Sequence, residues 1–335
     1  MTSGLPSTGY STSMPADFVP TLPDRIAALL LSPGSQLSVW SLLAAGLIAA
    51  GVAIAKRPTR AVSIRALARA MFPRHRLLSP SARADLGFTL MAIFVSSALF
   101  GWAILSHLSI SAWVGALLGA PLTLGLPPWV AVAATTVTLW VAYEFAYWLD
   151  HYLSHRWAWL WAFHKVHHSA ETLSPLTVFR VHPVDSIVFY NIVAVVTGVT
   201  AGVMHWMVGN GVSAWTIGGV NILTVVALLT IKHLHHSHAW IAWNGRLGRI
   251  LLSPAHHQIH HSVAVEHHDR NFGDMLGIFD WLAGTLHQPQ RRREPLTFGV
   301  DGVRAPHSVT GSLIEPFVDA AGTLRGNPAP TLSPR

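Results

Sequence analysis

The stretch WVAVAATTVTLWVAYEFAYWLDHYLSH, residues 129 to 155, decides the fold, because an apolar run passes directly into a pair of histidines. The run from Trp129 to Trp148 is long enough to cross about 30 Å of hydrocarbon as a helix. His151 and His155 follow it at a spacing that places both on one helical face. The sequence therefore predicts a helix that leaves a membrane with potential ligands at its end.

The composition of the whole chain supports a membrane protein. Hydrophobic residues make up 51% of the sequence, charged residues make up only 11%, and the mean hydropathy is positive. These values are unlike those of a soluble domain. We predict an all-α, polytopic membrane protein with about five transmembrane helices and a cytoplasmic helical cap that carries histidine boxes. The expected spans are Leu37–Ala55, Leu86–Leu105, Trp129–Trp148, Ile187–Val208 and Val212–Ile231.

One further apolar stretch, Ile110 to Leu126, is shorter and interrupted. It contains Gly119, Pro121 and Gly125, and two prolines follow it. We interpret it as a re-entrant or interfacial segment, and a sixth span stays open as an alternative.

The two ends of the chain differ from its centre. Residues 1–36 are rich in Ser, Thr and Pro and lack the basic region and apolar core of a signal peptide, so we expect a disordered tail. Residues 301–335 have a similar composition and are expected to form a C-terminal tail. Between them we place one integral membrane domain, 37–300, whose histidine boxes lie at 151–182 and 233–285.

Positive charge predicts the orientation in the membrane. The stretch 56–83, between the first two expected spans, holds eight basic residues and no acidic one: Lys56, Arg57, Arg60, Arg65, Arg69, Arg74, Arg76 and Arg83. By the positive-inside rule this segment is cytoplasmic. Such flanking arginines account for most of the formal net charge of +7. No nucleic-acid-binding motif accompanies them, so we expect no nucleic-acid partner.

The expected topology brings the two histidine-rich segments to the same side. The third span returns the chain to the cytoplasm, where the first segment begins. The fourth and fifth spans form a hairpin around residues 209–211, so the second segment emerges on the same face. An even number of spans between the segments allows them to meet.

The pattern H-x-x-H-H-S occurs twice, at 164–169 and 257–262. On a helix, positions i, i+3 and i+4 share one face, so each copy projects three imidazoles together. The pair at 151 and 155, and a further pair just after the fifth expected span, extend the set. The candidate metal ligands are His151, His155, His164, His167, His168, His233, His236, His257, His260 and His261.

Ten imidazoles are too many for one ion, because a first-row metal takes roughly four to six ligands, so two neighbouring metals are expected. Imidazole suits iron, copper, zinc and nickel alike, and spacing does not choose among them. The alternative is a non-enzymatic polytopic metal-binding or metal-transport protein, for example with closed zinc sites. The spans show almost no polar ligands near the bilayer midplane, which disfavours a transporter.

Four segments together resemble the fatty acid hydroxylase and sterol desaturase superfamily, in its bacterial form. They are EFAYWLDHYLSHRWAWLWAFHKVHHS (144–169), RVHPVD (180–185), SPAHHQIHHS (253–262) and DRNFGDMLGIFDWLAGT (269–285). The resemblance covers roughly the central half of the chain. Tyr152, Glu144 and His238 depart from residues common in the family, and these departures leave the substrate undefined.

The resemblance implies an oxygen-dependent enzyme with a histidine-ligated di-iron centre on the cytoplasmic face of the membrane, here a bacterial inner membrane. Except for the less certain His233, the candidate ligands match histidines of the family's boxes, and no further catalytic residue is expected. Histidine ligands need their second ring nitrogen held by a partner. Asp269 and Asn271 match a family signature beside the last box and are candidates for that role. Glu144, buried in an apolar span, is a third candidate.

The expected reaction attacks an unactivated C–H bond of a lipophilic substrate, such as a fatty acyl lipid, a sterol-like molecule or a carotenoid, that arrives from the bilayer. The cofactors would be two iron ions (Fe²⁺/Fe³⁺), with O₂ as co-substrate. Hydroxylation and desaturation both fit. The sequence contains no cysteine, which excludes a thiolate-bound iron–sulfur cluster within it. Electrons would therefore come from a separate protein, a ferredoxin or a cytochrome b5-like carrier with its reductase.

Overall fold

The computed structural model describes residues 22–56, 63–71, 73–96, 105–209, 211–300, 303 and 306–325. Helix dominates these residues, which agrees with the predicted helical class. The strands in the described part are β1 (Thr216–Ile217) and β2 (Val220–Asn221), which pair antiparallel with Thr216 opposite Asn221.

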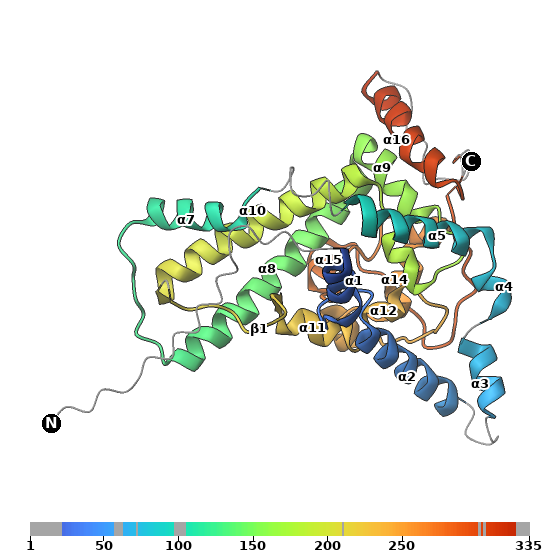
Figure 1. Ribbon diagram of the computed structural model, residues 1–335, viewed down its shortest axis with the longest axis horizontal. Coiled ribbons are helices and arrows are strands. Elements are labelled where there is room, and N and C mark those ends of the chain that lie inside the picture. The colour runs from blue at the N-terminus through green and yellow to red at the C-terminus, as the bar shows by residue number, and fades with distance from the viewer. Residues whose placement is uncertain are drawn as a thin grey trace.

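Two long helices form the axis of the molecule (Figure 1). They are α8 (Pro128–Arg156) and α10 (Pro183–Val208), and both are long and apolar enough to cross a membrane. Each begins with proline at its first position, where the missing N–H costs nothing. Many outward side chains on them are apolar and exposed, such as Trp129 and Val137. Length, apolar character and this exposed surface support a membrane protein.

The other expected spans differ from the prediction. Helix α2 (Val39–Ala55) is apolar but has only 17 residues. Helix α5 (Pro80–Met91) continues into a π-helical turn, η1 (Ala92–Ser96), and residues 97–104 of the expected second span lie outside the described residues.

The expected fifth span, 212–231, is wrong. Its first part is the β1–β2 hairpin, and only the short helix α11 (Ile222–Leu228) follows. Gly218 and Gly219 turn the hairpin with φ angles of 59° and 78°, which glycine adopts readily. Asn221 then caps α11 by accepting from Leu223 N at 3.0 Å. Hydropathy alone did not reveal these turn and cap signals.

The stretch 110–126 is partly helical. Helix α7 (His107–Leu118) packs along the second half of α10, and extended backbone follows it, with Leu122 N donating to Trp206 O at 2.8 Å. Gly202 permits the close approach, since a Cβ there would lie 2.7 Å from Ser111 O. The stretch is therefore a short helix docked on a longer one.

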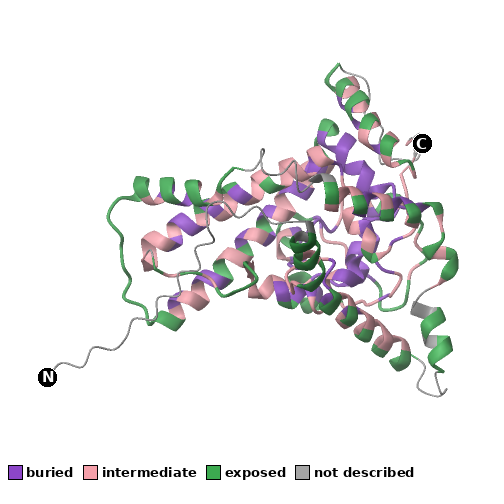
Figure 2. Ribbon diagram, viewed as in Figure 1, coloured by how far each residue is buried: buried purple, intermediate pink, exposed green. Residues whose placement is uncertain are grey.

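The remaining elements form a cap at the end of α8 that carries the histidines, and most buried residues gather there (Figure 2). Its helices are α9 (Ala158–His168), η3 (Pro175–Phe179), α12 (Lys232–His235), α13 (Gly245–Ile250), α14 (Pro254–His260), η4 (Val265–His267), α15 (Ile278–Ala283) and α16 (Val309–Leu324).

Parts of both expected tails are ordered helices. Residues 22–31 form α1 (Leu22–Leu31), and α16 lies in the expected C-terminal tail. Helix α16 packs on α9, where Phe163 and Phe317 meet edge to face and Lys165 pairs with Asp319. Ser308 caps its start, a signal that the Pro, Gly and Ser content concealed. Residues 1–21 and 326–335 of the expected tails lie outside the described residues.

The basic segment lies at the same end of the molecule as the histidines. It contains α3 (Ile64–Met71) and α4 (Arg74–Leu77). At its N-terminal edge, Lys56 Nζ donates to Trp240 O at 2.7 Å. Just beyond it, Asp85 and the fully buried Arg180 form a salt bridge of 2.7 Å. These two contacts join the edges of the basic segment to the part of the molecule that carries the histidines.

Candidate metal centre

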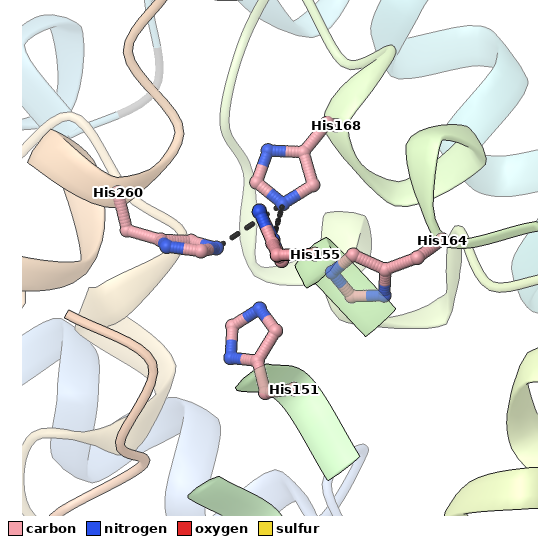
Figure 3. Close-up of side chains that lie close together, drawn as sticks. All are labelled: His151, His155, His164, His168 and His260. Carbon is pink, nitrogen blue, oxygen red and sulfur yellow. Dashed lines mark hydrogen bonds between the residues drawn. The ribbon is translucent and has the colours of Figure 1, made fainter. Parts of the chain in front are cut away.

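Nine of the ten candidate ligands gather in two clusters. The first is His151, His155, His164, His168 and His260, whose five rings converge from the three helices α8, α9 and α14 (Figure 3). The second is His167, His236, His257 and His261. Within each cluster, one nitrogen from every ring lies within 4.8 Å of the others. His233 is buried but lies outside both clusters.

Each copy of the H-x-x-H-H motif contributes histidines to both clusters, and the two copies divide them differently. The copy on α9 gives His164 and His168 to the first cluster and His167 to the second. The copy on α14 does the reverse and gives only His260 to the first cluster. Adjacent residues on a helix diverge by about 100°, so consecutive histidines reach different centres. The ring centroids of His168 and His261 are 4.6 Å apart, and the two clusters are therefore neighbours.

The spacing of the nitrogens fits metal ions. In the first cluster, His168 Nε2 lies 3.2 Å from His155 Nε2 and 3.1 Å from His260 Nε2. In the second, His236 Nε2 lies between 2.9 and 3.1 Å from the Nε2 atoms of His167, His257 and His261. Nitrogens placed tetrahedrally around an ion at about 2.0–2.1 Å stand roughly 3.3 Å apart.

Burial keeps these imidazoles neutral. The pKa values of His167, His168, His236, His257 and His261 are well below the ordinary value because of desolvation and the neighbouring imidazoles. Desolvation lowers the pKa of His260 to about 3. The neutral ring is the form that binds a metal. In the first cluster, His151 Nε2 and His164 Nε2 are buried without a hydrogen-bond partner, as a ligand nitrogen awaiting an ion would be.

The second ring nitrogens of three ligands are held by acceptors. His151 Nδ1 donates to Phe272 O at 2.8 Å, and His260 Nδ1 donates to Arg270 O at 2.7 Å. His164 Nδ1 lies 3.1 Å from Asp185 Oδ2. These bonds place the proton on Nδ1 and direct the lone pair of Nε2 into the cluster.

The loop 269–273 supplies two of those acceptors. Asp269 and Asn271 have φ angles of 56° and 58°, a left-handed conformation that Asp and Asn tolerate better than most residues. Between and after them, the carbonyls of Arg270 and Phe272 accept from His260 and His151. Asp280 anchors this loop by accepting from Phe272 N at 2.9 Å and Gly273 N at 2.8 Å.

The three predicted ligand-supporting residues have different roles. Asp269 Oδ1 lies 3.6 Å from His155 Nδ1, beside a predicted ligand. Asn271 donates to the carbonyls of His256 and His287 and so fixes backbone. Glu144 does not hold a histidine, because its Oε2 accepts from Met275 N at 2.8 Å and Leu276 N at 2.9 Å. Its buried carboxylate is therefore satisfied by backbone amides that follow the loop 269–273.

The three acceptors that hold the ligand imidazoles were not singled out from the sequence. Asp185 was one of several carboxylates near the boxes. It lies on α10 and His164 lies on α9, so spacing in the sequence could not show that the two would meet. The carbonyls of Arg270 and Phe272 depend on backbone conformation, which side-chain patterns do not reveal. Only the two positions with polar residues tolerant of positive φ hinted at them.

A cavity of about 600 Å³ adjoins both clusters, a volume typical of small-ligand sites. Six predicted ligands line it: His151, His164, His167, His233, His236 and His257. Its lining includes apolar side chains, among them Leu29, Met91, Val178, Phe179, Phe189 and Leu228. It also includes polar ones, among them Tyr143, Tyr147, Asp150, Asp185, Lys232 and Asp274. The cavity therefore suits an amphiphilic ligand next to the metal centre.

Comparison with known proteins identifies the class. The fatty acid hydroxylase family model matches residues 136–285, the region that holds both clusters. This match confirms the resemblance to that family seen in the sequence.

A particular relative is the ornithine lipid hydroxylase OlsE of Rhizobium tropici. The two chains are 29% identical over 177 residues, which are 52% of this chain and 47% of the relative. The chain thus spans about half the length of that protein. No solved structure matches this chain significantly. Both matches support a hydroxylase, which is an oxidoreductase.

Proposed function

We propose that this protein is a membrane-bound, oxygen-dependent di-iron hydroxylase of a polar lipid. The observation that carries the proposal is that two neighbouring clusters of buried imidazoles line one cavity with apolar and polar side chains. A closed structural metal site has no need of an adjoining ligand cavity. An enzyme must place a substrate bond against its metal centre.

Iron is the preferred metal for a chemical reason. Imidazole binds several first-row metals, but C–H hydroxylation requires a metal with redox chemistry, and zinc has none. When bound, two irons would supply the reductive activation of O₂. The balanced reaction takes a substrate C–H, one O₂, two electrons and two protons to C–OH and water. Five imidazoles would hold one iron and four the other.

The residues of this chain would orient the ligands and exclude water. The carbonyls of Arg270 and Phe272 and the carboxylate of Asp185 fix three imidazole rings. The ligands are almost completely buried, so bulk water would have little access to the reacting atoms. The apolar side chains that line the cavity would hold a hydrocarbon portion of the substrate, and the polar side chains would hold a headgroup.

A polar lipid is favoured over a sterol-like or carotenoid substrate. The unpartnered carboxylate oxygens of Asp150 and Asp185 in the cavity lining would stay unsatisfied beside a purely apolar ligand. The relative named as an ornithine lipid hydroxylase makes a lipid with an amino-acid headgroup the first candidate. Because both matched names are hydroxylases, hydroxylation is proposed before desaturation.

The proposed setting is a bacterial inner membrane, with multiple passes that include α8 and α10. The contacts at the two edges of the basic segment 56–83 join it to the cap, and by the positive-inside rule they support a cytoplasmic face for the cap and its metal centre. A separate ferredoxin or cytochrome b5-like protein, with its reductase, would deliver the electrons there.

The test is expression of the full chain with an electron-donating system, followed by lipid extraction and mass spectrometry. A lipid that gains one oxygen supports the proposal. His164→Ala and His260→Ala remove a ligand from the first cluster, and both should abolish the product while the protein still folds. Unchanged product in either folded variant, or a purified protein with two zinc ions and no lipid product, would contradict it.

A further inference from the structure

We propose that Asp150 and Asp185 form a cation-binding subsite in the cavity that receives the ammonium group of a lipid headgroup. The inference rests on the proposed function, since it specifies which class of lipid the centre would oxidise. It assigns to two carboxylates a role in selecting substrates that carry an amine.

Asp150 carries an unsatisfied carboxylate into the cavity wall. Its residue is only 6% exposed, it lines the cavity, and its Oδ1 has no hydrogen-bond partner. It lies on α8 immediately before the predicted ligand His151. A buried carboxylate without a partner is costly, so a ligand cation would satisfy it.

Asp185 adds a second free oxygen from the neighbouring helix α10. Its Oδ2 is engaged by His164, whereas its buried Oδ1 has no hydrogen-bond partner and the residue lines the same cavity. The two unpartnered oxygens therefore come from packed helices to the lining of one cavity. A positive group bound there would be attracted to both carboxylates.

Aromatic rings flank the same part of the wall. Tyr147 lies one helical turn before Asp150, and Phe189 lies one turn after Asp185. The two rings pack edge to face with centroids 5.7 Å apart, and both residues line the cavity. Aromatic rings attract an ammonium group, which adds to the effect of the carboxylates.

The protein's own cation in the cavity is already engaged. Lys232 is the one lysine or arginine among the described residues that line it. Its Nζ forms a short ion pair with Asp274 and lies 5.8 Å from the ring centroids of Tyr143 and Tyr147. Lys232 is therefore not a partner of Asp150 or Asp185, whose free oxygens remain to accept from a cationic ligand rather than an anionic one.

The experiment compares two lipids that differ in one charge. N-palmitoylornithine carries a free side-chain amine, and its side-chain N-acetyl derivative is neutral there. The full chain in membranes, with an electron-donating system, is tested as wild type, as Asp150→Asn, and as Glu171→Gln. Glu171 is a matched carboxylate with a side chain 57% exposed, outside the cavity lining. Binding of both radiolabelled lipids to the purified protein, and its iron content, are measured in parallel.

We expect wild type and Glu171→Gln to prefer the free amine by about tenfold or more in both conversion and binding, as for loss of a buried charge pair. In Asp150→Asn the preference should fall to about twofold or less, because only the amine-bearing lipid loses affinity. The iron content should match that of the wild type.

Three results would overturn the subsite. One is equal treatment of the two lipids by the wild type. Another is an unchanged preference in Asp150→Asn. The third is an equal loss of both lipids together with iron, which would show that Asp150 only offsets the charge of the metals. If no lipid gains oxygen in the wild type, the proposed function fails, and the binding preference alone then decides for or against the subsite.

Discussion

His164 on α9 and Asp185 near the start of α10 are joined by a bond of 3.1 Å between Nδ1 and Oδ2. This bond links a predicted metal ligand to one of the two helices that are long and apolar enough to cross a membrane. It also fixes the tautomer of the imidazole and directs its Nε2 into the first cluster.

Replacement of Asp185 should therefore weaken metal binding. We expect Asp185→Asn to lower metal affinity or activity by about 10- to 100-fold, as for other partners of ligating histidines. Iron retained after dialysis against a chelator measures the effect. Retention equal to that of the wild type would show that the bond does not support the ligand.

The anchor of the loop 269–273 gives a second prediction. Asp280 is fully buried and accepts from two backbone amides of the loop, from Thr285 Oγ1 and from Trp148 Nε1. Asp280→Asn should cost about 1–3 kcal/mol of stability, because at least one buried donor loses its acceptor. Thermal unfolding in detergent measures this change. A Tm equal to that of the wild type would contradict the anchoring role.

The contact between α7 and α10 offers a matched pair of glycine substitutions. A Cβ on Gly202 would lie 2.6 Å from Val114 Cβ, so Gly202→Ala should destabilise the protein by about 1–3 kcal/mol. Gly115 on α7 has no atom within 4 Å of such a Cβ, so Gly115→Ala should stabilise by about 0.5–1 kcal/mol. Equal Tm values for the two variants would show that the helices do not pack as described.

Acid should destabilise the metal-free protein. Desolvation lowers the pKa values of His256 and His260 to about 3, whereas an unfolded histidine titrates near 6.5. Below about pH 6.5 the unfolded chain therefore binds protons that the folded chain does not bind, and the free energy of unfolding falls as the pH falls. The Tm of the metal-free protein should be lower at pH 5.5 than at pH 7.5. A pH-independent Tm would contradict neutral, buried histidines.

Much of the site follows from spacing, but its division into two clusters does not. The i, i+3, i+4 positions of the histidines on α9 and α14 indicated shared faces and a pair of metals. Which histidine reaches which centre depends on how the two helices oppose each other. That packing assigns His167 to one cluster and His168 to the other.

The spans were less predictable for a related reason. Hydropathy located α8 and α10 correctly, since each is one uninterrupted helix. It failed for 212–231, where the Gly218–Gly219 turn and the Asn221 cap break an apolar segment. It also gave no sign of α16, which is stabilised by packing against α9.

The metal content of the purified full chain tests the central claim most directly. The two clusters predict about two iron ions per chain, measured by elemental analysis against protein concentration. His236→Ala, which removes a ligand only from the second cluster, should lower that ratio, whereas Glu171→Gln should not. Two tightly held zinc ions in place of iron, or a ratio unaffected by His236→Ala, would contradict the account.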